Sequence, residues 1–91
     1  MKVKGAIMSV IHSSIFLVIK KFLEHRGMIQ RLSKSNDEFK TLCEDYRMCK
    51  EALGYWNISD SDQSLLRIKE YRSLLKELEN EILLNVTVFT K

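Results

Sequence analysis

The apolar residues in the second half of the chain recur at alternating steps of three and four. Two such runs occur, one over residues 39–56 and one over residues 68–82. A 3.5-residue period places its members along one stripe of an α-helix, and such a stripe has to be covered by another helix. The residues of the two stripes, here called the seam, are Phe39, Leu42, Tyr46, Cys49, Leu53, Trp56, Ile68, Tyr71, Leu75, Leu78 and Ile82.

The segment between the two runs, residues 54–61, is rich in turn-forming residues. We therefore expect the first helix to end near Leu53, with Gly54 as the left-handed residue that follows it. The second helix is expected to begin around Ser59 to Ser61 and to extend to about residue 85. Residues 28–86 are thus predicted to form a helical hairpin.

The two outer ends of this hairpin also carry signals. Ser35 followed by Glu38 predicts a capping box at the start of the first helix. The last residues, from Val86 onward, are rich in β-branched side chains, which have a low helix propensity. We expect residues 87–91 to be a tail that is frayed or that lays Phe89 on a neighbour.

A third periodic run precedes the hairpin, from about Ala6 to Leu32. Gly27 weakens a helix interior by about 1 kcal/mol relative to alanine. We therefore expect a bend or break near residues 25–27. Residues 1–27 are interpreted as an apolar and basic N-terminal helical arm.

The composition fits an all-α protein. The 91 residues allow one domain, residues 1–91, and they are 45% hydrophobic and 30% charged without proline. A core of this size rarely supplies more than about 3–5 kcal/mol. We expect a helical hairpin with an additional N-terminal helix that associates into an oligomeric helical bundle or coiled coil, as a homo-oligomer.

The charge is divided unevenly along the chain. Residues 1–35 hold seven Lys/Arg and one acid, whereas residues 36–91 hold eight Lys/Arg and eleven acids. Such a split is typical of contact with nucleic acid or anionic lipid, or of the arm of one copy docking on the acidic hairpin of another. The basic residues are spread out and no nucleic-acid-reading motif accompanies them, so we favour docking and do not expect nucleic acid as a partner.

The arm has an uncharged stretch over residues 5–19. Fifteen helical residues reach about 22 Å, which is short of the roughly 20 residues that a membrane span needs. No signal-cleavage pattern follows. The arm is expected either to be buried in an oligomer or to lie on a membrane surface. A start at Met28 is a further alternative.

Cys43 and Cys49 are not expected to form a disulfide. Six helical residues separate them by about 9 Å, beyond the roughly 7 Å that a bridge spans. Reduced thiols that pack as small hydrophobes are typical of a cytoplasmic protein.

The chain offers no constellation for catalysis. His12 and His25 are far apart along the arm, and the sequence has no phosphate-binding glycine loop and no Cys/His cluster. The carboxylates of the hairpin are expected to lie on solvated faces, and they are Glu44, Asp45, Glu77, Glu79 and Glu81. We therefore expect no enzyme, with no catalytic residue, no cofactor and no metal.

Part of the chain resembles the YdcH-like family of small bacterial proteins of unknown function. The residues that carry the likeness are 28–39 (MIQRLSKSNDEF), Leu42, Glu44 to Tyr46, Leu53 and 68–83 (IKEYRSLLKELENEIL). The resemblance covers residues 25–84 and implies a helical hairpin that dimerises. It implies no activity, because the family has no assigned catalytic residues.

These observations predict a small non-enzymatic protein with a structural or adaptor role through helix–helix contacts. The competing hypothesis is a peripheral membrane protein tethered by its N-terminal helix. Tyr55 and Trp56 at the hairpin tip are expected either to close its end or to anchor a protein partner.

Overall fold

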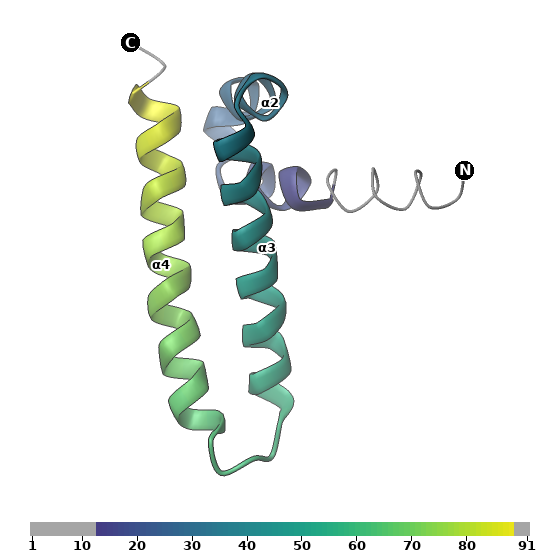
Figure 1. Cartoon of the computed structure of the whole chain (residues 1–91), viewed down its shortest axis with the longest axis vertical. Coiled ribbons are helices and arrows are strands. Elements are labelled where there is room, and N and C mark those ends of the chain that lie inside the picture. Colours follow the sequence, from purple (N-terminus) through teal and green to yellow (C-terminus); the bar gives the residue numbers. More distant parts are fainter. Residues whose placement is uncertain (1–12, 89–91) are drawn as a thin grey trace, which may run out of the picture.

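The computed structural model describes residues 13–88, and this part of the chain is all-α. Residues 13–21 are helical and lead through a turn at Phe22 into a short 3₁₀ helix, η1 (Leu23–His25). Three helices follow, namely α2 (Arg26–Ser35), α3 (Asp37–Ile58) and α4 (Ser64–Val88). Helices α3 and α4 run antiparallel, side by side, and residues 59–63 connect them (Figure 1).

The two remaining helical segments gather at one end of this hairpin. In Figure 1, α2 is seen nearly end-on where it crosses the end far from the 59–63 loop, and the helix of residues 13–21 passes behind α3. The buried hydrophobic cluster lies at this same end. It consists of Val18, Ile19, Ile29, Leu32, Phe39, Leu42, Cys43, Tyr46, Ile82 and Val86.

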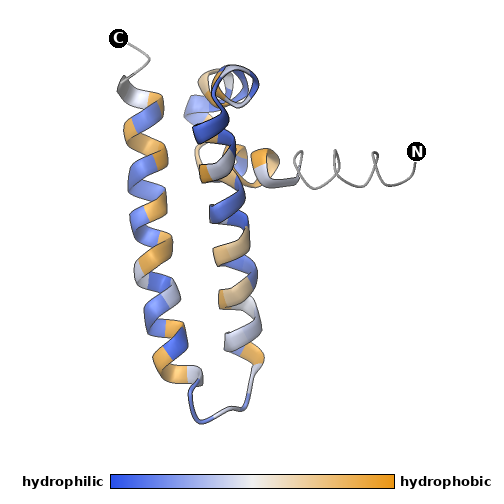
Figure 2. Ribbon diagram, viewed as in Figure 1, coloured by the Kyte–Doolittle hydropathy of each residue, from blue (hydrophilic) through white to orange (hydrophobic). Residues whose placement is uncertain are grey.

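The other half of the hairpin, toward the loop, has only two helices. Among its seam residues, Leu53, Trp56 and Ile68 are half-buried. The radius of gyration of 14.6 Å exceeds the value of about 12 Å for a compact chain of this length. Figure 2 shows hydrophobic residues along the whole of α4, although the covering helices reach only one end of it.

The prediction that the first hairpin helix ends at Leu53 is wrong. Helix α3 continues through Gly54 to Ile58, and no glycine among the described residues has a positive φ. The cost of one glycine in a helix, about 1 kcal/mol, is small beside the packing of an apolar side chain. The last turn of α3 carries such a side chain, the half-buried Trp56.

The reversal of the chain is instead made by serines after α3. Ser64 Oγ donates to the carbonyl oxygen of Ser59 at 3.1 Å, and the Gln63 amide donates to Ser61 Oγ at 3.2 Å. Short hydroxyl side chains form turns of this kind by bonding the nearby backbone. Helix α4 consequently begins at Ser64, later than the expected Ser59 to Ser61.

The capping box at Ser35 is also wrong. Ser35 is the last residue of α2, and its hydroxyl donates to the carbonyl oxygen of Arg31 at 3.0 Å. Asn36 leaves the helical conformation, with φ −132° and ψ 107°, and its Oδ1 accepts the amide of Phe39 at 3.1 Å. Asn36 therefore ends α2 and caps α3 within a single residue, which leaves Ser35 free to continue α2.

The expected break in the arm is confirmed, and it lies slightly earlier than predicted. The α-helix stops at residue 21, and the helical geometry resumes at Arg26, so Gly27 lies inside α2. The expected non-helical tail is wrong for residues 87 and 88, because they belong to α4. His12, Phe89 and the rest of residues 1–12 and 89–91 lie outside the described residues.

Candidate helix-pairing surface

The structure brings the predicted seam residues together between α3 and α4. Five of them are buried, and these are Phe39, Leu42, Tyr46, Cys49 and Ile82. The other six are half-buried, and these are Leu53, Trp56, Ile68, Tyr71, Leu75 and Leu78. The seam is thus mainly used within one chain, where it joins the two arms of the hairpin.

A polar contact at the buried end ties three segments together. The phenol of the fully buried Tyr46 donates to Glu79 Oε2 at 3.0 Å. Lys21 Nζ lies 3.7 Å from the same oxygen. The expectation that Glu79 lies on a solvated face is therefore wrong, since its side chain is only 24% exposed. Glu79 links α4 to α3 and to the N-terminal helix.

A second polar contact holds the N-terminal helix on α3. Arg47 Nε donates to Ser14 Oγ at 2.9 Å, and Arg47 Nη1 pairs with Glu51 at 2.8 Å. Ser14 itself is buried. The docking of the arm on the hairpin, expected between two copies, thus has a counterpart inside one chain.

The two cysteines are free and buried, as expected for thiols that pack as small hydrophobes. Burial, with a smaller effect of nearby Glu44, raises the pKa of Cys43 to about 12. Burial and then Glu79 raise the pKa of Cys49, whose Sγ donates to the carbonyl oxygen of Tyr71 at 3.3 Å. Both thiols are held in the protonated form, which is the unreactive one.

The same environment acts on Tyr46. Burial raises the pKa of its phenol, and the hydrogen bond and negative charge of Glu79 raise it further. The phenol therefore stays protonated and acts as a hydrogen-bond donor that fixes Glu79.

An open groove of about 420 Å³ runs between α3 and α4 on the outside of the hairpin. Successive residues turn by about 100° around a helix, so its α3 residues lie on a different side from Arg47, which holds the N-terminal helix. Met48 is 51% exposed on one wall and Leu74 is 43% exposed on the other. The lining residues, here called the groove face, are Asp45, Met48, Cys49, Ala52, Tyr71, Leu74 and Leu78.

Sequence periodicity picked out Cys49, Tyr71 and Leu78 of the groove face but missed Met48 and Leu74. Both missed residues stand just beside the seam and break its alternating steps. The available signal is the pair Leu74-Leu75, because two adjacent apolar residues widen the stripe of α4 to one side.

The aromatic pair at the hairpin tip packs edge to face. The rings of Tyr55 and Trp56 are 5.1 Å apart between centroids, with 83° between their planes. Trp56 is half-buried, whereas Tyr55 is 62% exposed. One aromatic ring of the tip is thus partly covered and the other is open to solvent. Closure of the hairpin end and anchoring of a protein partner both stay predictions.

Residues 13–88 include neither a metal-ligand cluster nor a membrane-spanning helix. No three His, Cys, Asp or Glu side chains within this range converge as ligands for a metal ion. No helix in the same range combines the length and the apolar composition that crossing a bilayer requires. The absence of enzymatic activity stays a prediction.

Comparison of the chain with known protein families, with curated proteins and with solved structures finds no match. The resemblance to the YdcH-like family therefore also stays a prediction. The candidate surface consequently has to be argued from the geometry of this chain alone.

Proposed function

We propose that this protein is a non-enzymatic association module that self-assembles through helix–helix contacts and serves a structural or adaptor role. The observation that carries the proposal is the groove face, where Met48 and Leu74 stand half-exposed on either side of an apolar hollow. An exposed apolar patch with polar residues around it is typical of a surface that binds another protein.

The hairpin gives this patch the form of a helix-pairing surface. Two parallel ridges with a groove between them accept the side chains of a further helix. Covering the exposed halves of Met48 and Leu74 contributes about 1–2 kcal/mol for each side chain. The loss of translational and rotational freedom opposes association by several kcal/mol. Two such side chains on each copy contribute about 4–8 kcal/mol in a symmetric dimer, and the lost freedom offsets much of this, so we expect weak and reversible self-association.

The experiment compares two leucines of α4 in the full chain. Leu74 and Leu83 are 43% and 39% exposed, and nine residues separate them, which is about half a turn around the helix. Leu74→Asp places a charge on the groove face, whereas Leu83→Asp places the same charge on the other side. Sedimentation velocity over a range of concentrations measures the association of each variant.

The proposal predicts that Leu74→Asp sediments as a monomer while Leu83→Asp associates like the unmodified chain. Circular dichroism checks that both variants keep their helices. Equal association of the two variants would show that the groove face is not the contact. A monomeric unmodified chain would remove self-association altogether.

A second candidate function, a peripheral membrane protein, is favoured by exposed apolar side chains of the N-terminal segment. Phe16 is 64% exposed and Leu23 is 65% exposed, with the exposed Lys20 between them in the sequence. Apolar side chains beside a cation are typical of segments that insert at an anionic bilayer surface.

Vesicle flotation tests this second function. The full chain should float with vesicles that contain phosphatidylserine, and the double variant Phe16→Ser/Leu23→Ser should remain in the dense fraction. Equal flotation of the two proteins, or none of either, would exclude contact through this surface.

We also propose a cytoplasmic location. The support is the pair of free, buried thiols, because thiols persist in reducing compartments. Membership of the YdcH-like family would fit this proposal, since that resemblance implies a bacterial hairpin that dimerises.

A further inference from the structure

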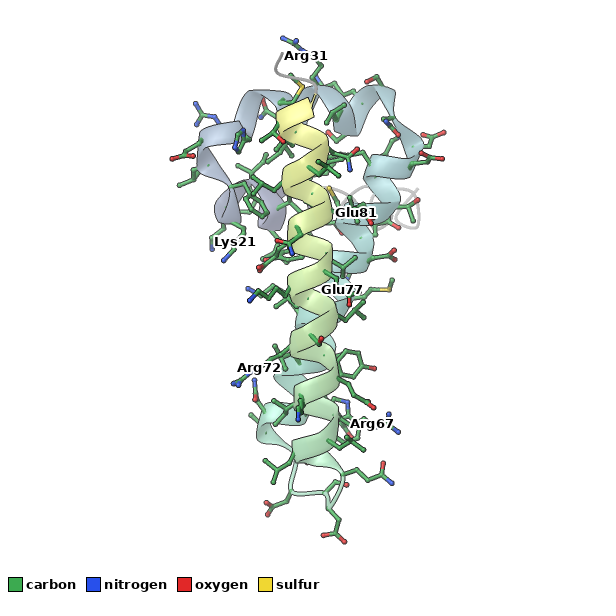
Figure 3. The ribbon with its side chains drawn as sticks, turned by 90° about the vertical axis from the view of Figure 1, so that its left-hand side faces the viewer. Lys21, Arg31, Arg67, Arg72, Glu77 and Glu81 are labelled. Atoms are coloured by element: carbon green, nitrogen blue, oxygen red, sulfur yellow. The ribbon has the colours of Figure 1, made fainter. Side chains whose placement is uncertain are left out.

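Helix α4 is electrostatically divided about its middle. The half before Leu74 carries Arg67, Lys69, Glu70 and Arg72, and the half after it carries Lys76, Glu77, Glu79 and Glu81. Figure 3 shows Arg67 and Arg72 toward the loop end and Glu77 and Glu81 toward the opposite end. The helix therefore has a basic half and an acidic half.

Three residues of this helix share one stripe. Arg67, Leu74 and Glu81 are spaced by seven residues, which is close to two full turns or about 10.5 Å. Leu74 lies on the groove face, so Arg67 and Glu81 flank that face at equal distances on either side. The stripe thus has a positive residue at one end, the apolar Leu74 at its centre and a negative residue at the other end.

The neighbouring helix reinforces the acidic end. Tyr46 of α3 contacts Glu79, so the adjacent Asp45 lies beside the acidic half of α4. Asp45 is exposed and lines the groove. The groove face therefore carries negative charge from both helices at the end of Glu81.

A surface with this arrangement complements a second copy of itself when that copy is turned by 180°. Antiparallel pairing about Leu74 places the Arg67 of each copy near Glu81 and Asp45 of the other. Parallel pairing places like charges together. Because an isologous contact repeats each interaction twice, one favourable pair per copy counts double.

We propose that two copies pair antiparallel through their groove faces, with the two-fold axis at Leu74. Two Arg67–Glu81 ion pairs then form across the contact. This inference rests on the proposed self-association. Arg67 Nη1 already lies 3.0 Å from Glu70 within the chain, and both side chains are about half exposed. A guanidinium has five N–H donors, so it can bond a second carboxylate without releasing the first.

The test reverses these charges in the full chain. The variants are Arg67→Glu, Glu81→Arg and the double variant with both reversals. Arg72→Glu is the matched control, since Figure 3 shows Arg72 on the other flank of α4 from Arg67. Both test reversals suit the dipole of α4, because a glutamate comes near its N-terminus and an arginine near its C-terminus. Arg67→Glu also loses the ion pair with Glu70, so circular dichroism checks that each variant keeps its helices.

The expected result is that each single reversal raises the dimer dissociation constant about tenfold, as two opposed pairs become repulsive. The double reversal should recover most of the lost affinity but not all of it, because Asp45 keeps its negative charge, and Arg72→Glu should leave the original constant within about twofold. An equimolar mixture of the two single variants should form a heterodimer that is tighter than the homodimer of either single variant. Sedimentation equilibrium at about 50 mM salt, where screening is weak, measures the dissociation constants of the four variants and of the mixture.

The outcomes separate the two proposals. If Leu74→Asp removes the dimer but the reversals at Arg67 and Glu81 do not weaken it, self-association through the groove face stands and the antiparallel pairing is overturned. If the unmodified chain is a monomer at every concentration, both proposals are overturned.

Discussion

Replacing Gly54 by alanine tests the course of α3. The substitution should stabilise the protein if the helix continues past residue 54, and destabilise it if Gly54 is a left-handed residue after the helix end. In the structure Gly54 is a helical residue, four positions before the end of the helix at Ile58. A Cβ added there would meet no atom of the described residues within 4 Å. Alanine should therefore fit without any clash.

The magnitude follows from the backbone. Alanine is favoured over glycine by about 0.8–1 kcal/mol in a helix interior, because glycine loses more conformational freedom on folding. Gly54 is close to the helix end, where fraying reduces this difference. We expect Gly54→Ala to raise the free energy of unfolding by about 0.5–1 kcal/mol, or the Tm by about 2–8 °C.

The assay is urea and thermal unfolding followed by circular dichroism at one fixed protein concentration. Gly27→Ala in α2, where an added Cβ also meets nothing within 4 Å of it, is a comparison expected to change stability in the same direction. A left-handed residue after the helix would instead be destabilised by alanine, by about 1 kcal/mol. A loss of stability in Gly54→Ala would therefore refute a helix that runs past residue 54.

Three further substitutions test the remaining contacts. Asn36→Ala should lower the free energy of unfolding by about 1 kcal/mol through loss of the cap, whereas Ser35→Ala should change it by less than about 0.5 kcal/mol; urea unfolding that ranks them the other way would contradict the cap. Tyr46→Phe should cost about 1–2 kcal/mol, and the cost should shrink in a Glu79→Gln background, as a double-mutant cycle measures. Folding keeps the Cys43 thiol protonated, so its stabilisation is complete below pH 9 and is lost as the pH rises toward about 12. Cys43→Ala should therefore lose less stability than the unmodified chain between pH 9 and 10.5, and equal losses would argue against this burial effect.

The sequence pattern was sufficient for the class of structure. The three-four spacing of the seam reflects the same geometry that lets one stripe of each helix face its neighbour, so all-α structure and the pairing of the two helices followed from it. Three side chains of the seam, Phe39, Tyr46 and Ile82, are fully buried in the structure.

Helix ends were less predictable, because several residues compete for each end. Ser35 and Asn36 are both good caps, and only the backbone path from α2 into α3 decides between them. Gly54 favours an end, but α3 continues past it to Ile58, and its last turn carries the half-buried Trp56. Propensity is a weak prior wherever tertiary contacts oppose it.

The groove face was missed because it depends on two helices together. Met48 stands beside Cys49 but outside the alternating steps of the seam, and nothing in the sequence indicates that Leu74 lies across from it. The role of Glu79 has the same origin, since Tyr46 and Lys21 reach it from distant parts of the chain. Such juxtapositions appear only when the antiparallel register is known.

The molecular mass in solution tests the central claim most directly. Sedimentation equilibrium of the unmodified full chain, from about 1 µM to 1 mM, should give a mass that rises with concentration from the monomer value of 10.7 kDa toward twice that value. A mass that stays at 10.7 kDa across the whole range would contradict an apolar hairpin face that binds a second copy.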